Sequence, residues 1–182
     1  KEEVAALCLA AYTLAELPDG RLLCVMRGSN GGSKDLDCKL PSYRWYSVSE
    51  DGGYHWTKPE PWTYDDGTPF FSPSSMSQLL THSSGRYFWL GNLNGENCRG
   101  NHPRYPLVIG EVDAKTLRLI KDTVLVGDTK RPEEPDINLS HWWAFEDRET
   151  HDIVIAGARH SQGYKGSAPW LWRVGVNAPA GT

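Results

Sequence analysis

The chain has 182 residues, enough for one domain with a hydrophobic core, and 11% of them are aromatic. Charged residues make up 23% and the net charge is -4, a globular composition that excludes a disordered chain. Because no run of basic residues is present, nucleic-acid binding has little electrostatic support.

The most apolar segment lies near the N-terminus and reads VAALCLAAYTLAEL. It is shorter than a membrane span and lacks the basic start and the cleavage site of a signal peptide, so we expect no membrane span and leave the localisation open. Cys8 and Cys24 lie in apolar runs, which favours buried free thiols. Cys38 and Cys98 lie in polar loops, where a disulfide between them remains an open alternative.

Similar hairpin patterns recur along the chain. Each combines a strand, a polar turn and a second apolar strand, in ELPDGRLLCVMRG, LLTHSSGRYFWLGN and FEDRETHDIVIAGAR. Leu22, Tyr87 and Ile153 occupy equivalent positions, so the repeat is roughly 65 residues long. A second hairpin follows each first one, in YRWYSVSEDGGYHWT, YPLVIGEVDAKTLRLI and WLWRVGVNA.

Two hairpins per repeat predict four-stranded antiparallel units in series, which are typical of a β-propeller. We therefore expect an all-β fold, a single partial propeller domain over residues 1–182. The approximate blades are 12–65, 75–127 and 138–182, of which the last is incomplete. A β-sandwich with coincidentally similar hairpins is the alternative.

The turn of the second hairpin, in SVSEDGGYHW, carries a specific pattern of a hydroxyl, a carboxylate, glycines and an indole. Asp51 can accept hydrogen bonds from the backbone of its own turn, Gly53 supplies backbone freedom, and Trp56 folds back over the hairpin. Ser49 can tie the end of the strand to the turn. This structural role is favoured over a role for Asp51 as a catalytic acid. The pattern resembles the Asp-box repeats of sialidases and related propeller proteins.

The resemblance to sialidases extends to two arginine-bearing segments, ELPDGRLLCVMR and NHPRYPLVIGEVD. In that family two of the three arginines that clamp the substrate carboxylate fall at the positions of Arg27 and Arg104. A guanidinium group suits this task because its planar fork binds a carboxylate through two hydrogen bonds. The resemblance covers about half of a six-bladed sialidase propeller. It implies an exo-acting glycoside hydrolase, or a related carbohydrate-active enzyme, whose parent protein is secreted or periplasmic.

The sequence departs from the catalytic pattern of the family. Sialidases use a tyrosine nucleophile activated by a glutamate. The glutamate position falls on Ala11, and the tyrosine position falls on Leu139 or Ser140. The acid/base aspartate and the first arginine of the family belong to blades outside the part that the chain resembles.

Polar residues nevertheless gather near these positions in the sequence. His141 adjoins the tyrosine position and is the candidate catalytic residue, as a base in hydrolysis or proton abstraction. The candidate substrate-binding residues, besides the two arginines of the clamp, are Arg159 and Glu96. Arg99, His102 and His160 are read as solvated or hydrogen-bonded loop residues.

Two functional hypotheses follow from the sequence. The first is a sialidase-like propeller that acts on, or binds, a glycan with a carboxylate. The alternative is a non-catalytic propeller that serves as a carbohydrate-binding or protein-interaction module. The sequence predicts no cofactor and no metal site. An open arc of blades predicts either a homodimer that closes the ring or a poorly stable fragment.

Overall fold

The protein is built from β-strands arranged in antiparallel sheets. The computed structural model describes residues 10–32, 35–161 and 167–177, which form three four-stranded sheets and a short 3-10 helix. The predicted all-β class and the predicted four-stranded antiparallel units are confirmed. No helix of membrane-spanning length occurs in these ranges.

The first and second sheets are simple meanders, in which each strand pairs with the next one along the chain. The first sheet consists of β1 (Ala10–Glu16), β2 (Leu22–Arg27), β3 (Arg44–Ser49) and β4 (Glu60–Pro61). The second sheet consists of β5 (Gln78–Thr81), β6 (Tyr87–Asn92), β7 (Leu107–Val112) and β8 (Leu125–Asp128), with the 3-10 helix η1 (Lys121–Thr123) before β8.

The third sheet has a different construction. Its meander contains β10 (Trp142–Glu146), β11 (Ile153–Ser161) and β12 (Ala168–Val174). The short strand β9 (Ile137–Asn138) pairs with the far end of the long strand β11, beyond the part of β11 that pairs with β10. The fourth strand of this sheet therefore precedes the meander instead of following it.

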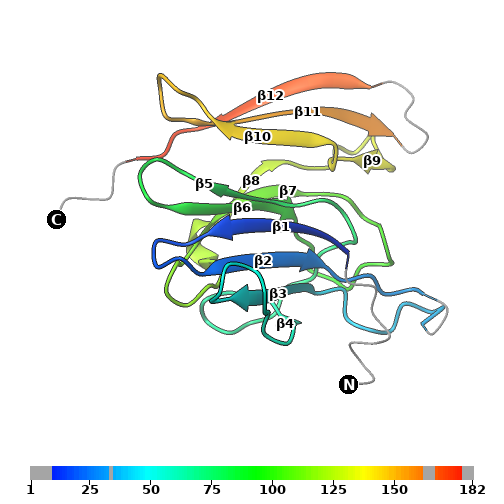
Figure 1. Ribbon diagram of the computed structural model, residues 1–182. Helices are drawn as coiled ribbons and strands as arrows, with labels where there is room; N and C mark the ends of the chain where they lie inside the picture. The colour runs from blue at the N-terminus through cyan, green and yellow to red at the C-terminus, as the bar shows by residue number, and fades with distance from the viewer. Residues whose placement is uncertain (1–9, 33–34, 162–166, 178–182) are drawn as a thin grey trace.

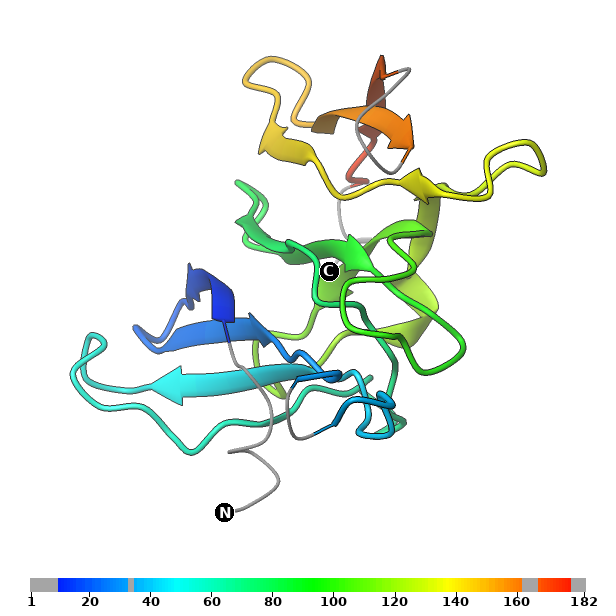
Figure 2. The same cartoon turned by 90° about the vertical axis from the view of Figure 1, so that its right-hand side faces the viewer.

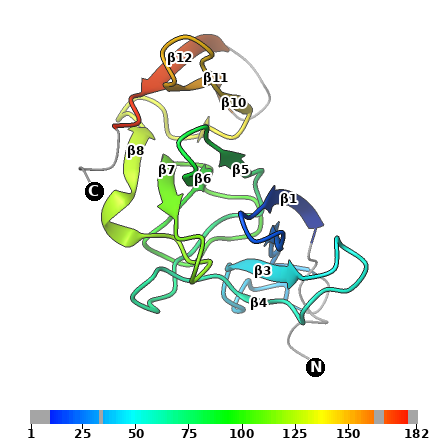
Figure 3. The ribbon, with the colours of Figure 1, turned by 60° about the vertical axis from the view of Figure 1, so that its left-hand side comes forward.

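The sheets stack in chain order, with the second sheet between the first and the third (Figures 1 and 2). The first strands of the meanders lie along the same side of the stack (Figure 3), where β1 contacts β5 and β5 contacts β10. Side chains connect these strands: Thr13 Oγ1 accepts a hydrogen bond from the N–H of Leu79 (2.8 Å), and the Gln78 amide bonds to both backbone groups of Ala144.

Two hydrophobic cores hold the stack together, one on each face of the second sheet. Side chains point alternately to opposite faces of a strand, and β6 is buried along its whole length. Tyr87 and Trp89 belong to the core shared with the first sheet, while Phe88 and Leu90 belong to the core shared with the third. The run YFWLG is apolar because both of its faces are covered.

The contact between the second and third sheets includes a very close approach at Gly127. A Cβ atom added to this residue of β8 would lie 1.7 Å from Cζ3 of Trp172 in β12. The absence of a side chain at this position allows the indole of Trp172 to lie against the backbone of β8.

The outer faces of the stack carry exposed apolar side chains. On the first sheet Tyr12 is 69% exposed, whereas Ala15 of the same strand is buried on the inner face. On the third sheet Trp143 is 64% exposed, whereas the preceding residue, Trp142, is buried on the inner face. A cavity of about 600 Å³ lies on the outer face of the first sheet. Its lining includes Tyr12, Leu14, Cys24, Met26 and Trp56.

The turn after β3 contains hydrogen bonds of the kind that the sequence predicted for it. Ser49 Oγ accepts a hydrogen bond from the N–H of Gly53 (2.9 Å) and donates one to Asp51 Oδ1 (2.9 Å), which also accepts from the N–H of His55 (2.8 Å). The Trp56 indole folds back and donates to the carbonyl of Gly53 (2.9 Å), but it remains 40% exposed. The four predicted Asp-box residues thus close the turn among themselves.

Candidate functional site

Arg27 and Arg44 face each other across two neighbouring strands. Arg27 ends β2 and Arg44 begins β3, and the register of the sheet pairs them directly. Both guanidinium groups reach the same segment, residues 72–75, which lies between β4 and β5. Arg27 Nη1 donates a hydrogen bond to the carbonyl of Ser74 (3.1 Å), and Arg44 Nη2 donates one to the carbonyl of Ser75 (2.8 Å).

Arg44 is fully buried and is held by neutral groups. Its Nε donates to Ser72 Oγ (2.8 Å), and Nη2 also contacts Ser75 Oγ (3.2 Å), whereas Nη1 is buried without a hydrogen-bond partner. Among the described residues, no carboxylate forms an ion pair with this guanidinium. Burial and, secondly, the positive charge of Arg27 lower the pKa of Arg44 to about 9, so the group stays charged at pH 7.

Asn92 connects this pair of arginines to the other two sheets. It is fully buried at the end of β6, and its Oδ1 accepts a hydrogen bond from Ser75 Oγ (2.8 Å). Its Nδ2 donates to the carbonyls of Pro106 (3.1 Å) and Leu139 (3.2 Å). A single amide therefore joins the support of Arg44 to the segment after Arg104 and to the segment before His141.

A second connection leads from Arg27 to Arg104. Ser74, whose carbonyl accepts from Arg27, donates its own N–H to the carbonyl of Gly100 (2.8 Å). The next residue, Asn101, accepts a hydrogen bond from Arg104 Nε (3.0 Å). The structure thus brings the two arginines of the predicted clamp to the same end of neighbouring sheets.

Arg104 also contacts the segment that includes the predicted tyrosine position. Its Nη1 donates to Ser140 Oγ (3.1 Å), and Ser140 is buried. Leu139, the other residue at the expected tyrosine position, is fully buried in the hydrophobic core. Ala11 lies in β1, but its side chain is outside the described residues. The polar group next to Arg104 is therefore a serine hydroxyl.

His141 follows this serine and packs against His160 at the end of β11. The two rings meet edge to face with centroids 4.7 Å apart, and His160 is buried while His141 is exposed. Partial desolvation and, secondly, the charges of His160 and Arg104 lower the pKa of His141. The ring of His141 is therefore neutral at pH 7 and able to accept a proton. We call the following set the strand-end cluster: Arg27, Arg44, Asn92, Arg104, Ser140 and His141.

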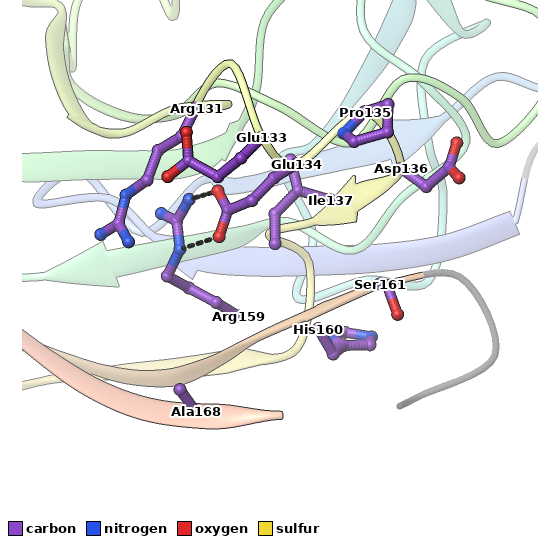
Figure 4. A pocket seen from close by; sticks show the side chains of 10 residues that line it. All are labelled: Arg131, Glu133, Glu134, Pro135, Asp136, Ile137, Arg159, His160, Ser161 and Ala168. Carbon is purple, nitrogen blue, oxygen red and sulfur yellow. Dashed lines mark hydrogen bonds and ion pairs between the residues drawn. The ribbon is translucent and has the colours of Figure 1, made fainter. Parts of the chain in front are cut away.

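Arg159, predicted as a substrate-binding residue, is committed to ion pairs within the protein. It is buried, and it contacts the carboxylates of Asp128 and Glu134. Burial lowers the pKa of Arg159, but the hydrogen bonds to Glu134 and Asp128 outweigh this effect and raise it. Figure 4 shows the pair with Glu134 in the wall of a cavity of about 400 Å³, which His160 and Asp136 also line.

A second cavity, of about 390 Å³, lies on the other side of residues 135–137. Asn97, Arg99, His102 and Tyr105 contribute to its lining. Its lining residues Pro103 and Tyr105 flank Arg104 in the sequence, but no residue of the strand-end cluster lines it. Glu96, the remaining predicted site residue, is exposed in a bend of the same loop, and it does not line this cavity.

The described cysteines Cys24, Cys38 and Cys98 are free thiols, and Cys24 and Cys98 are buried. Cys8 lies outside the described residues. No group of three or more His, Cys, Asp or Glu side chains placed to hold a metal ion occurs within residues 10–32, 35–161 and 167–177.

Sequence reasoning overlooked two residues of the strand-end cluster, Arg44 and Asn92. Both lie in strand segments rich in aromatic and aliphatic residues, YRWYSVS and YFWLGN, where an isolated arginine or asparagine is a weak signal of a buried network. Comparison with family models and with curated proteins finds no match for this chain.

Proposed function

We propose that the chain forms part of a sialidase-like Asp-box propeller that binds an acidic glycan at the strand-end cluster. The observation that carries this proposal is a chain of hydrogen bonds between Arg27 and Arg104. Arg27 donates to the carbonyl of Ser74, the N–H of Ser74 donates to the carbonyl of Gly100, and Arg104 donates to the carbonyl of the next residue, Asn101. Two guanidinium groups on one side of a stack of sheets match the planar, bidentate recognition of a carboxylate.

Several features of the fold support the propeller part of the proposal. The meanders stack face to face, and their first strands, β1, β5 and β10, are neighbours. A propeller requires such stacked sheets with neighbouring first strands around its axis, so this arrangement supports the proposal. The hydrogen bonds that Ser49 makes to Asp51 and Gly53 close the turn, which supports its interpretation as an Asp-box.

Within this site, His141 is the candidate for proton transfer. Its neutral ring lies beside Arg104 and Ser140, so a glycan carboxylate held by the arginine would place neighbouring sugar atoms near the imidazole. The tyrosine–glutamate pair of sialidases has no counterpart at Ser140. Turnover would therefore have to use different chemistry, and binding alone is the function of the alternative interaction module.

The test is a titration with acidic and neutral sugars, using sialyllactose and methyl glucuronide against lactose and methyl glucoside. We expect saturable binding of the acidic sugars by calorimetry, and a loss of at least about tenfold in affinity for Arg27→Gln and Arg104→Gln. Arg148→Gln, at an exposed arginine in the turn after β10, is the matched control and should bind as the wild type does.

The same samples separate an enzyme from a binding module. Product formation that is lost in His141→Ala, with binding retained, supports a catalytic role for the imidazole. Binding without product supports the interaction module. Equal affinity for acidic and neutral sugars, or no binding of either, would contradict the proposed function.

We also propose that two copies of the chain associate through their outer faces. The exposed apolar side chains Tyr12 and Leu14 on the first sheet, and Trp143 and Phe145 on the third, support this proposal because water contact with such surfaces is unfavourable. Two copies related by a twofold axis would supply roughly six four-stranded units, a number within the range in which propellers close. Light scattering at micromolar concentration should give the mass of a dimer, and a monodisperse monomer would refute the association.

A further inference from the structure

The strand-end cluster contains a buried positive charge that the described part of the protein does not balance. Arg44 is fully buried, and its closest charged neighbour in the sheet register is another cation, Arg27. All of its hydrogen-bond acceptors are neutral: hydroxyls and carbonyls of Ser72, Pro73 and Ser75.

This arrangement is costly for the folded protein. Removing a charge from water is strongly unfavourable unless an opposite charge or a full set of hydrogen bonds compensates for it. An arginine cannot escape the cost by losing its proton at neutral pH. Arg159, which is almost equally buried, has two carboxylate partners, so the same chain compensates a buried guanidinium elsewhere.

A purely structural anchor for residues 72–75 would not require a cation. The hydrogen bonds to Ser72 and Ser75 use Nε and Nη2, and Nη1 remains without a partner. A neutral amide side chain could donate to one of these acceptors without the cost of a buried charge. An arginine makes more of these hydrogen bonds than an amide can and also lies over the ring of Trp89, 5.8 Å from its centroid. Besides this reach, it adds a positive charge at the register position opposite Arg27.

We propose that Arg44 is a positioning and specificity-determining residue. Its buried positive charge makes the site at Arg27 selective for an anionic group. When the ligand is bound, the negative charge of that group compensates the charge of Arg44. This inference rests on the proposed binding of a carboxylate-bearing glycan. Arg44 does not touch the ligand, because its guanidinium is covered by the 72–75 segment. It acts through the electrostatic potential at Arg27 and through the carbonyl of Ser74, which Arg27 contacts.

The expected effect follows from Coulomb's law. A unit charge roughly 10 Å from a carboxylate, at an effective dielectric constant of about 20, changes the affinity by about tenfold. We expect Arg44→Gln to bind methyl glucuronide about tenfold more weakly than the wild type does. Its affinity for methyl glucoside should remain unchanged, because this sugar carries no charge. Arg44→Lys, which keeps the charge, should retain most of the selectivity.

The outcomes distinguish the two proposals. If the wild type fails to prefer methyl glucuronide and sialyllactose over their neutral counterparts, the proposed function has failed and the inference falls with it. If the wild type shows the preference and Arg44→Gln shows it equally, only the role of Arg44 is refuted. A uniform loss of affinity for acidic and neutral sugars in Arg44→Gln would assign the residue a structural role and overturn the inference.

A measurement on the unmodified protein keeps the test decisive if Arg44→Gln does not fold. The Nε–H group of Arg44 donates to Ser72 Oγ inside the protein, so its proton should exchange slowly and give a separate NMR signal. We expect this signal to shift during titration with methyl glucuronide and to stay in place with methyl glucoside. A signal that is unmoved when methyl glucuronide saturates the site would refute the proposal.

Discussion

Replacement of Asn92 by alanine should strongly destabilise the fold, because this amide joins all three sheets. The substitution removes the hydrogen bond from Ser75 Oγ and the two hydrogen bonds to the carbonyls of Pro106 and Leu139. Each is worth about 1 kcal/mol net, and partners left buried without a new contact cost more, so the expected loss is about 3 to 5 kcal/mol. That loss is a large part of the roughly 5–15 kcal/mol that stabilises a typical domain.

Urea unfolding monitored by tryptophan fluorescence measures this loss, and thermal unfolding should show a decrease in Tm of at least about 6 °C. Asn94→Ala is the matched control. Asn94 is only half-buried and donates one long hydrogen bond to the carbonyl of Pro103 (3.4 Å), so its replacement should cost less than about 1 kcal/mol. A single hydrogen bond contributes about 1 kcal/mol. A free energy of unfolding of Asn92→Ala that lies within about 1 kcal/mol of the wild-type value would therefore refute the network described for the strand-end cluster.

Three further predictions concern other parts of the fold. Burial opposes ionisation of Glu146, but hydrogen bonds from Ser83 and His151 lower its pKa to about 2, below the ordinary value of 4.5. The contribution of this carboxylate to the free energy of unfolding should be complete above pH 4.5 and disappear as the pH falls towards 2. Glu146→Gln should remove this pH dependence from unfolding curves. Gly127→Ala should cost about 1–3 kcal/mol in urea unfolding because of the clash with Trp172, whereas Gly32→Ala, with open space around it, should be nearly neutral. Burial raises the pKa of the Cys24 thiol to about 11, so a thiol reagent at pH 8 should label Cys24 much more slowly than the half-buried Cys38; equal rates would contradict the burial of β2.

The repetition of hairpin signals along the chain was sufficient to predict the all-β class and the four-stranded units. Leu22, Tyr87 and Ile153 each begin the second strand of a hairpin, as the sequence predicted, because alternation and turn residues act over only a few positions. The hydrogen bonds of the turn after β3 were predictable for the same reason, since Ser49, Asp51 and Gly53 bond within one turn.

The composition of the candidate site depended instead on contacts between residues far apart in the sequence. Arg27 and Arg104 were expected from a resemblance, but Arg44 and Asn92 were not, because their partners Ser75 and Leu139 lie in connecting segments far away in the sequence. Arg159 was predicted to bind substrate, and its pairing with Glu134 became evident only in the folded chain.

Local patterns thus determined which segments of this protein become strands and turns, since hydrogen bonding and alternation are properties of neighbouring residues. Only the tertiary structure decided which polar side chains are buried together and which charges are compensated. Stacking the sheets removes water from Arg44, Asn92 and Ser140 at the same time. The free-energy cost of burying each of these polar groups then depends on the hydrogen-bond or charge partner that the neighbouring segment supplies.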